Sequence, residues 1–163
     1  MYIRKLIDSI DIICQQYKTS FELYMKLRNI LDTIDYNEFN SDLKNFNYEN
    51  IIEIKNSNDV YTKYILKSSE TFDLVLIKWN KNSFTKIHDH PDKGCLLKVL
   101  SGYLIEECYN NNEKYFSFDK MNFLIKNNIG YKIGKKILHK IKAMQNSESL
   151  HIYIPGNYTS KNY

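Results

Sequence analysis

The sequence predicts a mainly β fold: a closed antiparallel barrel or jelly roll with a helical cap at its N-terminus. The chain has 163 residues with 43% apolar content, which suits one domain with a sizeable core. Apolar residues recur at helical spacing first, and short alternating segments separated by turn signals follow. Many short strands with regular turns are typical of closed antiparallel folds. We therefore expect one domain over residues 1–163, with a helical cap over 1–46 and a β-barrel over 51–155.

Two helices and a shorter third one are expected in the cap, covering one face of the sheet. Thr19 followed by Glu22 matches a capping box, so the second helix should begin there. The third helix is predicted around Tyr36 to Phe46. The apolar residues at helical spacing are Ile3, Leu6, Ile7, Ile10, Ile13, Cys14 and Tyr17 in the first helix, and Phe21, Tyr24, Leu27, Ile30 and Leu31 in the second.

The strands are predicted from alternation and turn residues. Residues 72–79 are largely apolar on both faces, which indicates a strand that is covered on both sides. Ser101-Gly102 is predicted to join strands at 95–100 and 103–109 as a hairpin. The remaining predicted elements are a turn at 110–113, a strand at 115–118, and a last pair of strands at 137–141 and 149–154.

The distribution of charge argues against two classes of partner. The net charge is +4, but 23 basic and 19 acidic residues are interspersed. We therefore expect no nucleic-acid partner, which would need a basic stripe interleaved with aromatic residues. No run approaches the roughly 18 apolar residues of a transmembrane helix, so no membrane partner is expected. The residues nearest to a basic stripe, most of them expected on a solvated strand face, are Lys132, Lys135, Lys136, Lys140 and Lys142.

The cysteines and the N-terminus indicate a compartment. Cys14, Cys95 and Cys108 are odd in number and include no close Cys-x-x-Cys pair, so a disulfide framework is not expected. Asp8 and Asp11 interrupt the apolar residues at the N-terminus, which argues against a signal peptide. We expect a cytoplasmic protein, and a monomer.

A pair of histidines, His88 and His90, is the strongest chemical signal. Two residues one position apart on a strand share a face, and Asp89 then points away. Such a pair is half of a metal site. His139 lies on a predicted strand near the C-terminus. A lone histidine there would more often belong to the core, but the pair favours a third ligand at this position.

A row of polar residues stands on the last predicted strand. Ser149, His151 and Tyr153 face one side, and the apolar residues between them face the core. A hydroxyl, an imidazole and a phenol in this order form a possible hydrogen-bond relay. The alternative is an ordinary strand with a solvated face.

Several separate stretches resemble one enzyme family. Trp79 lies nine residues ahead of the histidine pair, and Cys95 follows where most metal-binding cupins have a glutamate ligand. Cysteine at that position together with a Ser-x-His-x-Tyr strand is far more specific than the general cupin pattern. The chain thus resembles the cysteine dioxygenases, thiol dioxygenases of the cupin superfamily. The matching stretches are Tyr61-Thr62-Lys63, Trp79, His88-Asp89-His90, Cys95 to Lys98, Gly102, Leu138 to Ile141 and Ser149 to Tyr153.

The resemblance implies a role for each of these positions. His88, His90 and His139 would ligate Fe(II) in a cupin barrel. Cys95 and Tyr153 match the pair that forms a thioether cross-link in the family's animal members. The resemblance also makes Ser149, His151 and Tyr153 a hydrogen-bonding triad and Tyr61 and Lys63 substrate-binding residues, and it places a cis bond at Ile154-Pro155. The second cupin motif departs from the pattern, with Ala143 in place of a common asparagine.

Physical chemistry supports the implied reaction independently. Three neutral imidazoles leave the full positive charge on Fe(II), whereas the usual non-haem oxygenase site includes a carboxylate. Such a centre favours an anionic ligand such as a thiolate. Holding sulfur and O2 on one metal is the positioning that S-oxygenation needs. Cys95 also has a simpler interpretation, since free cysteines are often buried small hydrophobic residues.

Lys63 is the main departure from the family. Cysteine-specific members have an arginine here that clamps the substrate carboxylate, and relatives acting on 3-mercaptopropionate have a glutamine. Lysine keeps the charge but loses the planar bidentate fork. The other arginines, Arg4 and Arg28, lie in the helical region. Lys63 is therefore either a point-charge contact for a carboxylate or a solvent-facing lysine. Gly94 also replaces a bulkier residue of some relatives, which would widen the pocket.

Three functions follow from these observations. The first is an Fe(II)-dependent enzyme that oxidises L-cysteine with O2 to cysteine sulfinic acid. The second is dioxygenation of another small thiol carboxylate such as 3-mercaptopropionate. The third is a non-catalytic metal-binding cupin, which bound zinc would support because three histidines and a water also suit zinc.

Overall fold

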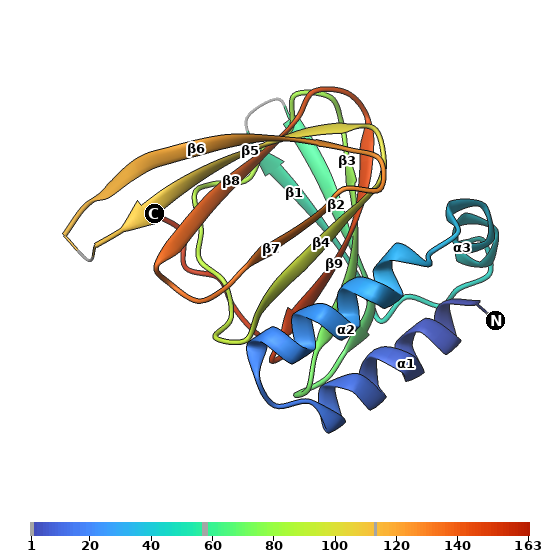
Figure 1. Ribbon diagram of the computed structural model, residues 1–163. Coiled ribbons are helices and arrows are strands. Elements are labelled where there is room, and N and C mark those ends of the chain that lie inside the picture. Colours follow the sequence, from blue (N-terminus) through green and yellow to red (C-terminus); the bar gives the residue numbers. More distant parts are fainter. Residues whose placement is uncertain (1, 57–58, 113) are drawn as a thin grey trace.

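The computed structural model describes residues 2–56, 59–112 and 114–163. Within them, three helices precede nine strands, in the order that the sequence predicts (Figure 1). The helices are α1 (Tyr2–Gln16), α2 (Ser20–Asp32) and α3 (Tyr36–Leu43). The strands are β1 (Asn50–Asn56), β2 (Asp59–Ser68), β3 (Asp73–Trp79), β4 (Gly94–Ser101), β5 (Tyr103–Asn111), β6 (Phe116–Ile125), β7 (Ile129–Lys132), β8 (Ile137–Ala143) and β9 (Ser147–Ile154).

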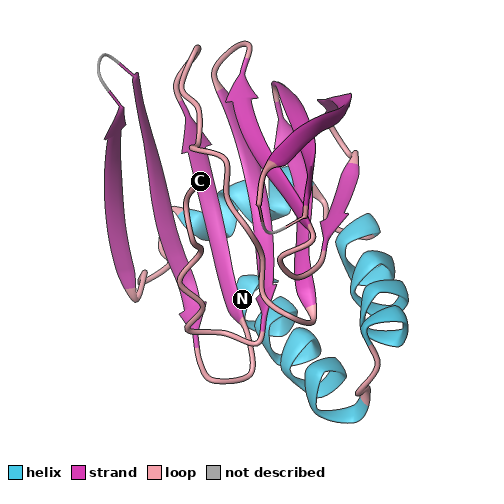
Figure 2. Cartoon of the chain, turned by 90° about the vertical axis from the view of Figure 1, so that its left-hand side faces the viewer, coloured by secondary structure: helices cyan, strands magenta, loops and turns pink. Residues whose placement is uncertain are grey.

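The strands form two antiparallel sheets. One has six strands in the order β1-β2-β3-β9-β4-β7, and the other has three in the order β6-β5-β8. Residues of β3, β4 and β9 contribute to two separate apolar clusters, one against the helices and one between the sheets. This explains why the sequence of β3 is apolar on both faces. Figure 2 shows the helices gathered against the strands, which leaves the other face of the large sheet for a site between the sheets.

Helix α2 begins after Thr19, as the capping-box pattern predicts, but the hydrogen bonds differ from those of a full capping box. The Thr19 hydroxyl accepts a hydrogen bond from the Glu22 N–H at 3.2 Å, which satisfies one of the free amides of the first turn. The same hydroxyl donates to the Glu22 carboxylate at 2.7 Å. The Glu22 side chain thus bonds to the Thr19 hydroxyl and not to the Thr19 N–H, so only half of the capping box forms.

Two predicted strand pairings are wrong. Ser101-Gly102 does not close a hairpin, because β4 pairs with β7 and β9 while β5 pairs with β6 and β8. Gly102 has φ +85°, and a Cβ there would lie 2.2 Å from Ser147 Oγ, so this glycine lets the chain pass from one sheet to the other. The segments predicted as a last pair, β8 and β9, likewise lie in different sheets.

The predicted turn at 110–113 connects strands that do pair. β5 runs on through Asn111, which is opposite Phe116 of β6, and Glu113 lies outside the described residues. The two strands form the long hairpin at one side of Figure 1. Among the described residues, no helix is long and apolar enough to cross a membrane.

Candidate functional site

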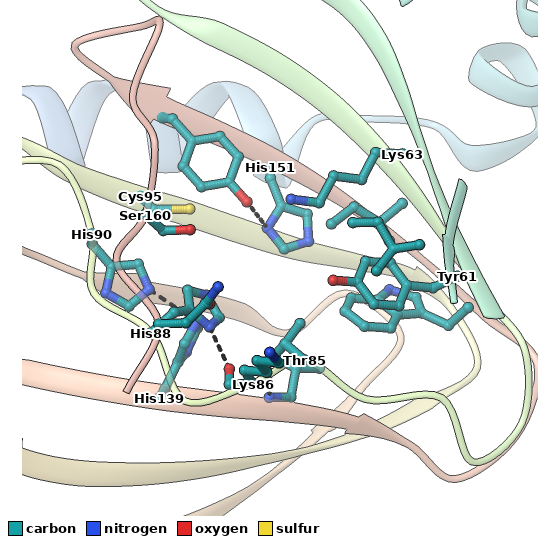
Figure 3. A pocket seen from close by; sticks show the side chains of 16 residues that line it. Tyr61, Lys63, Thr85, Lys86, His88, His90, Cys95, His139, His151 and Ser160 are labelled. Carbon is teal, nitrogen blue, oxygen red and sulfur yellow. Dashed lines mark hydrogen bonds between the residues drawn. The ribbon is translucent and has the colours of Figure 1, made fainter. Parts of the chain in front are cut away.

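A cavity of about 320 Å³ lies inside the barrel and brings together most of the residues singled out from the sequence. Of the candidate catalytic, substrate-binding and metal-ligating residues, only Ser149 does not line it. The lining residues are Ile54, Tyr61, Lys63, Ile77, Trp79, Thr85, Lys86, His88, His90, Cys95, His139, Ile141, His151, Tyr153, Ser160 and Asn162 (Figure 3).

The histidine pair does not lie on a regular strand, contrary to the prediction. His88 forms isolated bridges with His139 and Asn162, and His90 lies in a loop. Pro91 follows directly and has no N–H, so a hydrogen-bonded ladder cannot continue past this point. The alternation survives in this extended segment, because both imidazoles reach the cavity and Asp89 does not line it.

Asp89, which lies between the two histidines and points away from the cavity, binds the C-terminal segment of the chain. Its side chain is buried and accepts hydrogen bonds of 2.7 Å from the Tyr158 hydroxyl and from the Lys161 N–H. The Tyr163 N–H donates to the Ile87 carbonyl at 2.9 Å. The C-terminal segment is thereby fixed beside the histidine pair.

The three candidate ligands converge through their Nε2 atoms. His139 Nε2 lies 2.9 Å from His90 Nε2 and 3.1 Å from His88 Nε2. Figure 3 shows these side chains close together at one end of the cavity. The three candidate ligand atoms all lie within 4.8 Å of one another, close enough to share one metal ion.

Hydrogen bonds on the far side of two rings fix their tautomers. His88 Nδ1 lies 2.8 Å from the Lys86 carbonyl and His139 Nδ1 lies 2.7 Å from Glu106 Oε1, and both partners only accept. Each Nδ1 therefore holds the ring proton, and each Nε2 presents a lone pair. Two lone pairs facing each other at 3.1 Å repel, and a cation between them removes the repulsion. The donor set thus fits a divalent metal.

Burial keeps these imidazoles neutral. Burial, and after it the charge of the neighbouring His139, lower the pKa of His88 to about 3, from an ordinary 6.5. Burial likewise lowers the pKa of His90 and of His139. Neutral imidazole is the form that binds metal, so the ligands need not lose a proton at neutral pH.

Glu106, which contacts the candidate ligand His139, was not among the candidate residues identified from the sequence. Its carboxylate is 3% exposed and lies on the inward face of β5, between buried Leu104 and Cys108. It also accepts hydrogen bonds from Asn122 Nδ2 at 2.7 Å and from Lys132 Nζ at 3.0 Å. The sequence does contain a signal for this residue, because a glutamate at an inward-facing position of an alternating strand is unusual and indicates a buried partner. Lys132 belongs to the group of five lysines of which most were expected on a solvated face, and it is instead a mostly buried ion-pair partner.

The row on β9 forms a connected relay. Trp79 Nε1 donates to Ser149 Oγ at 2.8 Å, and the same hydroxyl lies 2.8 Å from His151 Nε2. His151 Nδ1 lies 3.5 Å from the Tyr153 hydroxyl oxygen. The three side chains thus form a chain of hydrogen bonds that ends at Tyr153, which lines the cavity.

Cys95 and Tyr153 are direct partners across strands β4 and β9. Burial raises the pKa of the Cys95 thiol to about 12, and a hydrogen bond with Tyr153 acts the other way. Burial also raises the pKa of Tyr153 well above its usual value. Both groups are therefore protonated at neutral pH. The Ile154–Pro155 bond beside them is cis, as the resemblance implies.

Lys63 and Tyr61 project into the cavity from β2 (Figure 3). Burial lowers the pKa of Lys63. Within the described parts of the chain, no carboxylate lies within ion-pair distance of its ammonium group. Tyr61 stacks on Trp79 with ring centroids 4.9 Å apart. Lys63 thus faces the cavity and not the solvent.

The chain is similar to known proteins in both sequence and fold. A family model described as cysteine dioxygenase type I matches residues 13–163. Cysteine dioxygenase type 1 is 30% identical over 107 residues in Rattus norvegicus and 28% identical over 104 residues in Homo sapiens. Each match covers 58% of this chain and 51% of the relative, so the chain spans about half the length of the curated relatives it matches.

The fold is also similar to that of solved structures. Oxalate decarboxylase from Bacillus subtilis at pH 4.6 has a TM-score of 0.55 at 11% identity, covering 72% of this chain and 31% of that one. A variant of the same decarboxylase has a TM-score of 0.53 at 12% identity, covering 70% and 30%. These likenesses concern the fold alone, and they confirm the predicted cupin barrel. Because the family model matches far more than half of the chain, this protein belongs to the cysteine dioxygenase type I family.

Proposed function

We propose that this chain is a thiol dioxygenase that uses non-haem Fe(II) to convert L-cysteine and O2 to cysteine sulfinic acid. The reaction balances without another reductant: both oxygen atoms enter the product, sulfur loses four electrons, and O2 gains them. The observation that supports this most is the convergence of three neutral imidazoles beside the Cys95–Tyr153 pair. Family membership supports the same reaction class.

The proposed ligands are His88, His90 and His139. Fe(II) bound there would supply one centre for a thiolate and O2, with no carboxylate among its proposed protein ligands. The lowered pKa of the imidazoles makes the site ready to bind metal at neutral pH. Zinc in place of iron would support the non-catalytic alternative, since three histidines also suit zinc.

The other residues would bind and orient the substrate. Lys63 would attract the substrate carboxylate as a point charge inside the cavity. Tyr153 would donate its hydroxyl proton to the reacting groups, with His151 and Ser149 fixing the direction of that bond. Tyr61, held by stacking on Trp79, would limit the space beside the substrate. Fixed donors of this kind cost no reorganisation when the reaction occurs.

A second candidate is the dioxygenation of another small thiol carboxylate, such as 3-mercaptopropionate. The observation that favours it is Lys63, which cannot grip a carboxylate in the bidentate way that an arginine does. Because a point charge imposes less orientation on the carboxylate, a different spacing between thiol and carboxylate fits as well. We also propose that the protein is cytoplasmic, which three buried free cysteines among the described residues support. A monomer is proposed as well.

A thiol panel separates these candidates. Protein loaded with Fe(II) without oxygen is given O2 and cysteine, 3-mercaptopropionate or cysteamine, and O2 uptake and sulfinate are measured. We expect a product from a thiol carboxylate and little from cysteamine, which lacks the carboxylate. Lys63→Met should raise KM for the carboxylate thiols, while Lys78→Met, a lysine that pairs with Glu148, should not. Absence of sulfinate with all of these thiols would contradict the proposal.

A further inference from the structure

The carboxylate of Glu106 stands directly behind one candidate metal ligand. Its Oε1 atom lies 2.7 Å from Nδ1 of His139, the ring nitrogen that faces away from the other two histidines. Both groups are buried, with exposed fractions of 3% for Glu106 and 5% for His139. Water therefore has little access to replace this hydrogen bond. The carboxylate is the group that determines which nitrogen of the His139 ring holds the proton.

The second oxygen of Glu106 is fully occupied. Oε2 accepts from Lys132 Nζ at 3.0 Å and from Asn122 Nδ2 at 2.7 Å. One of these donors is the ammonium group of Lys132, which forms a mostly buried ion pair with the carboxylate. An ionised carboxylate held in this way can only accept from His139.

The position of Glu106 also explains why it is not itself a ligand. It contacts the far side of the His139 ring, so the imidazole separates it from the point where the Nε2 atoms meet. A negative carboxylate that accepts from Nδ1 forces the proton onto that nitrogen, which leaves the Nε2 lone pair for a metal. It also fixes the rotation of the ring.

We propose that Glu106 is a positioning residue that sets the tautomer and orientation of His139 for metal binding, with Lys132 and Asn122 holding the carboxylate in place. This inference rests on the metal site of the proposed function. It adds a carboxylate to a centre whose three ligands are all neutral. Glu106 contacts the ring and does not line the cavity, so it would leave the cavity side of a bound metal to substrate.

Metal binding and the His139 tautomer together test the proposal, and neither depends on turnover. Co(II) affinity is measured by titration for the wild-type protein, Glu106→Gln, Glu106→Asp and the control Glu107→Gln. Glu107 is the neighbouring residue on β5 and lies near Lys140, at 3.9 Å. We expect affinity to fall about 10- to 100-fold in both Glu106 variants and to be unchanged in the control. Folded Glu106 variants that bind Co(II) as tightly as the wild type would overturn the proposal.

The tautomer is measured in the metal-free wild-type protein from the ring nitrogen chemical shifts. We expect the His139 proton on Nδ1, and a proton on Nε2 would overturn the proposal even if no variant folds. The two measurements also separate this inference from the proposed function. A wild-type protein that binds no Co(II) or Fe(II) contradicts the metal site, whereas normal metal binding with unaltered Glu106 variants contradicts the role of Glu106 alone.

Discussion

The Nε2 atoms of His88 and His139 lie 3.1 Å apart with no proton between them, because each ring holds its proton on Nδ1. Removing this repulsion is a direct gain from metal binding, so a divalent ion should stabilise the fold. At a metal concentration of about 100 Kd the gain is roughly 2.7 kcal/mol, or about 5–10 °C in melting temperature for a protein of this size.

Calorimetry with and without Fe(II) or Co(II) checks this first prediction. His139→Ala should abolish the metal-dependent shift. His151→Gln is the matched control, since this fourth histidine bonds to Ser149 and is not part of the converging group. A shift that persists in His139→Ala would place the metal elsewhere.

A thioether between Cys95 and Tyr153 is the second prediction. The two residues are direct cross-strand partners, and a pKa of about 12 keeps the Cys95 thiol protonated and unreactive by itself. The bond should therefore form only in iron-loaded protein exposed to O2, which accepts the two electrons and two hydrogens lost. Intact-protein mass spectrometry should show a loss of two hydrogens. Tyr153→Phe and Cys95→Ser should lack it, and Cys14→Ser, in the helical cap, should retain it.

The relay on β9 gives the third prediction. Ser149→Ala would leave Trp79 Nε1 and His151 Nε2 without their partner in a buried site. We expect a loss of stability of about 1–3 kcal/mol, and a fall in kcat of roughly tenfold if one hydrogen bond of that strength is lost in the transition state. Steady-state kinetics and urea unfolding measure the two effects. An unchanged kcat would show that the orientation of His151 does not matter for turnover. The control for stability is Ser117→Ala, since Ser117 is exposed.

The buried imidazoles give the fourth prediction, on acid stability of the metal-free protein. The unfolded chain takes up a proton on His88 near pH 6.5, but the folded protein does so only at about pH 3. Between these values the unfolded state binds more protons, so the free energy of unfolding falls as pH drops, by about 1.4 kcal/mol per pH unit for each such group. The pKa of Glu106 is lowered from its ordinary value of 4.5, so this group also reduces the free energy of unfolding as pH falls below 4.5.

Urea unfolding between pH 7 and pH 5 measures this slope. His88→Asn removes one of the titrating groups and should reduce the difference in the free energy of unfolding between pH 7 and pH 5 by about 2 kcal/mol. A metal-free protein that is equally stable at pH 7 and pH 5 would show that these imidazoles do not have lowered pKa values.

Local patterns in the sequence were enough to find most of the candidate site. The His-x-His pair and the Ser-x-His-x-Tyr strand each depend only on alternation, which extended backbone imposes whether or not the segment belongs to a sheet. His88 and His90 illustrate this, since they reach the cavity from a bridged loop and not from a strand. The helical cap followed from periodicity in the same way.

The features that the sequence did not predict depend on pairings between segments that lie far apart in the chain. Glu106 acts on His139 because β5 lies beside β8, with Cys108 opposite His139. Ser101-Gly102 marks a change of chain direction, but the turn residues do not reveal that the next strand joins the other sheet. Ser160 and Asn162 line the cavity because Asp89 and Ile87 bind the C-terminal segment, and no motif marks them.

Isotope labelling of the product is the most direct test of thiol dioxygenation by this protein. The protein is loaded with Fe(II) without oxygen and then given cysteine and ¹⁸O₂, and the product is weighed by mass spectrometry. We expect cysteine sulfinic acid with two ¹⁸O atoms and one O2 consumed per cysteine. Sulfinate with one labelled oxygen, or O2 consumption that yields only cystine and peroxide, would contradict it.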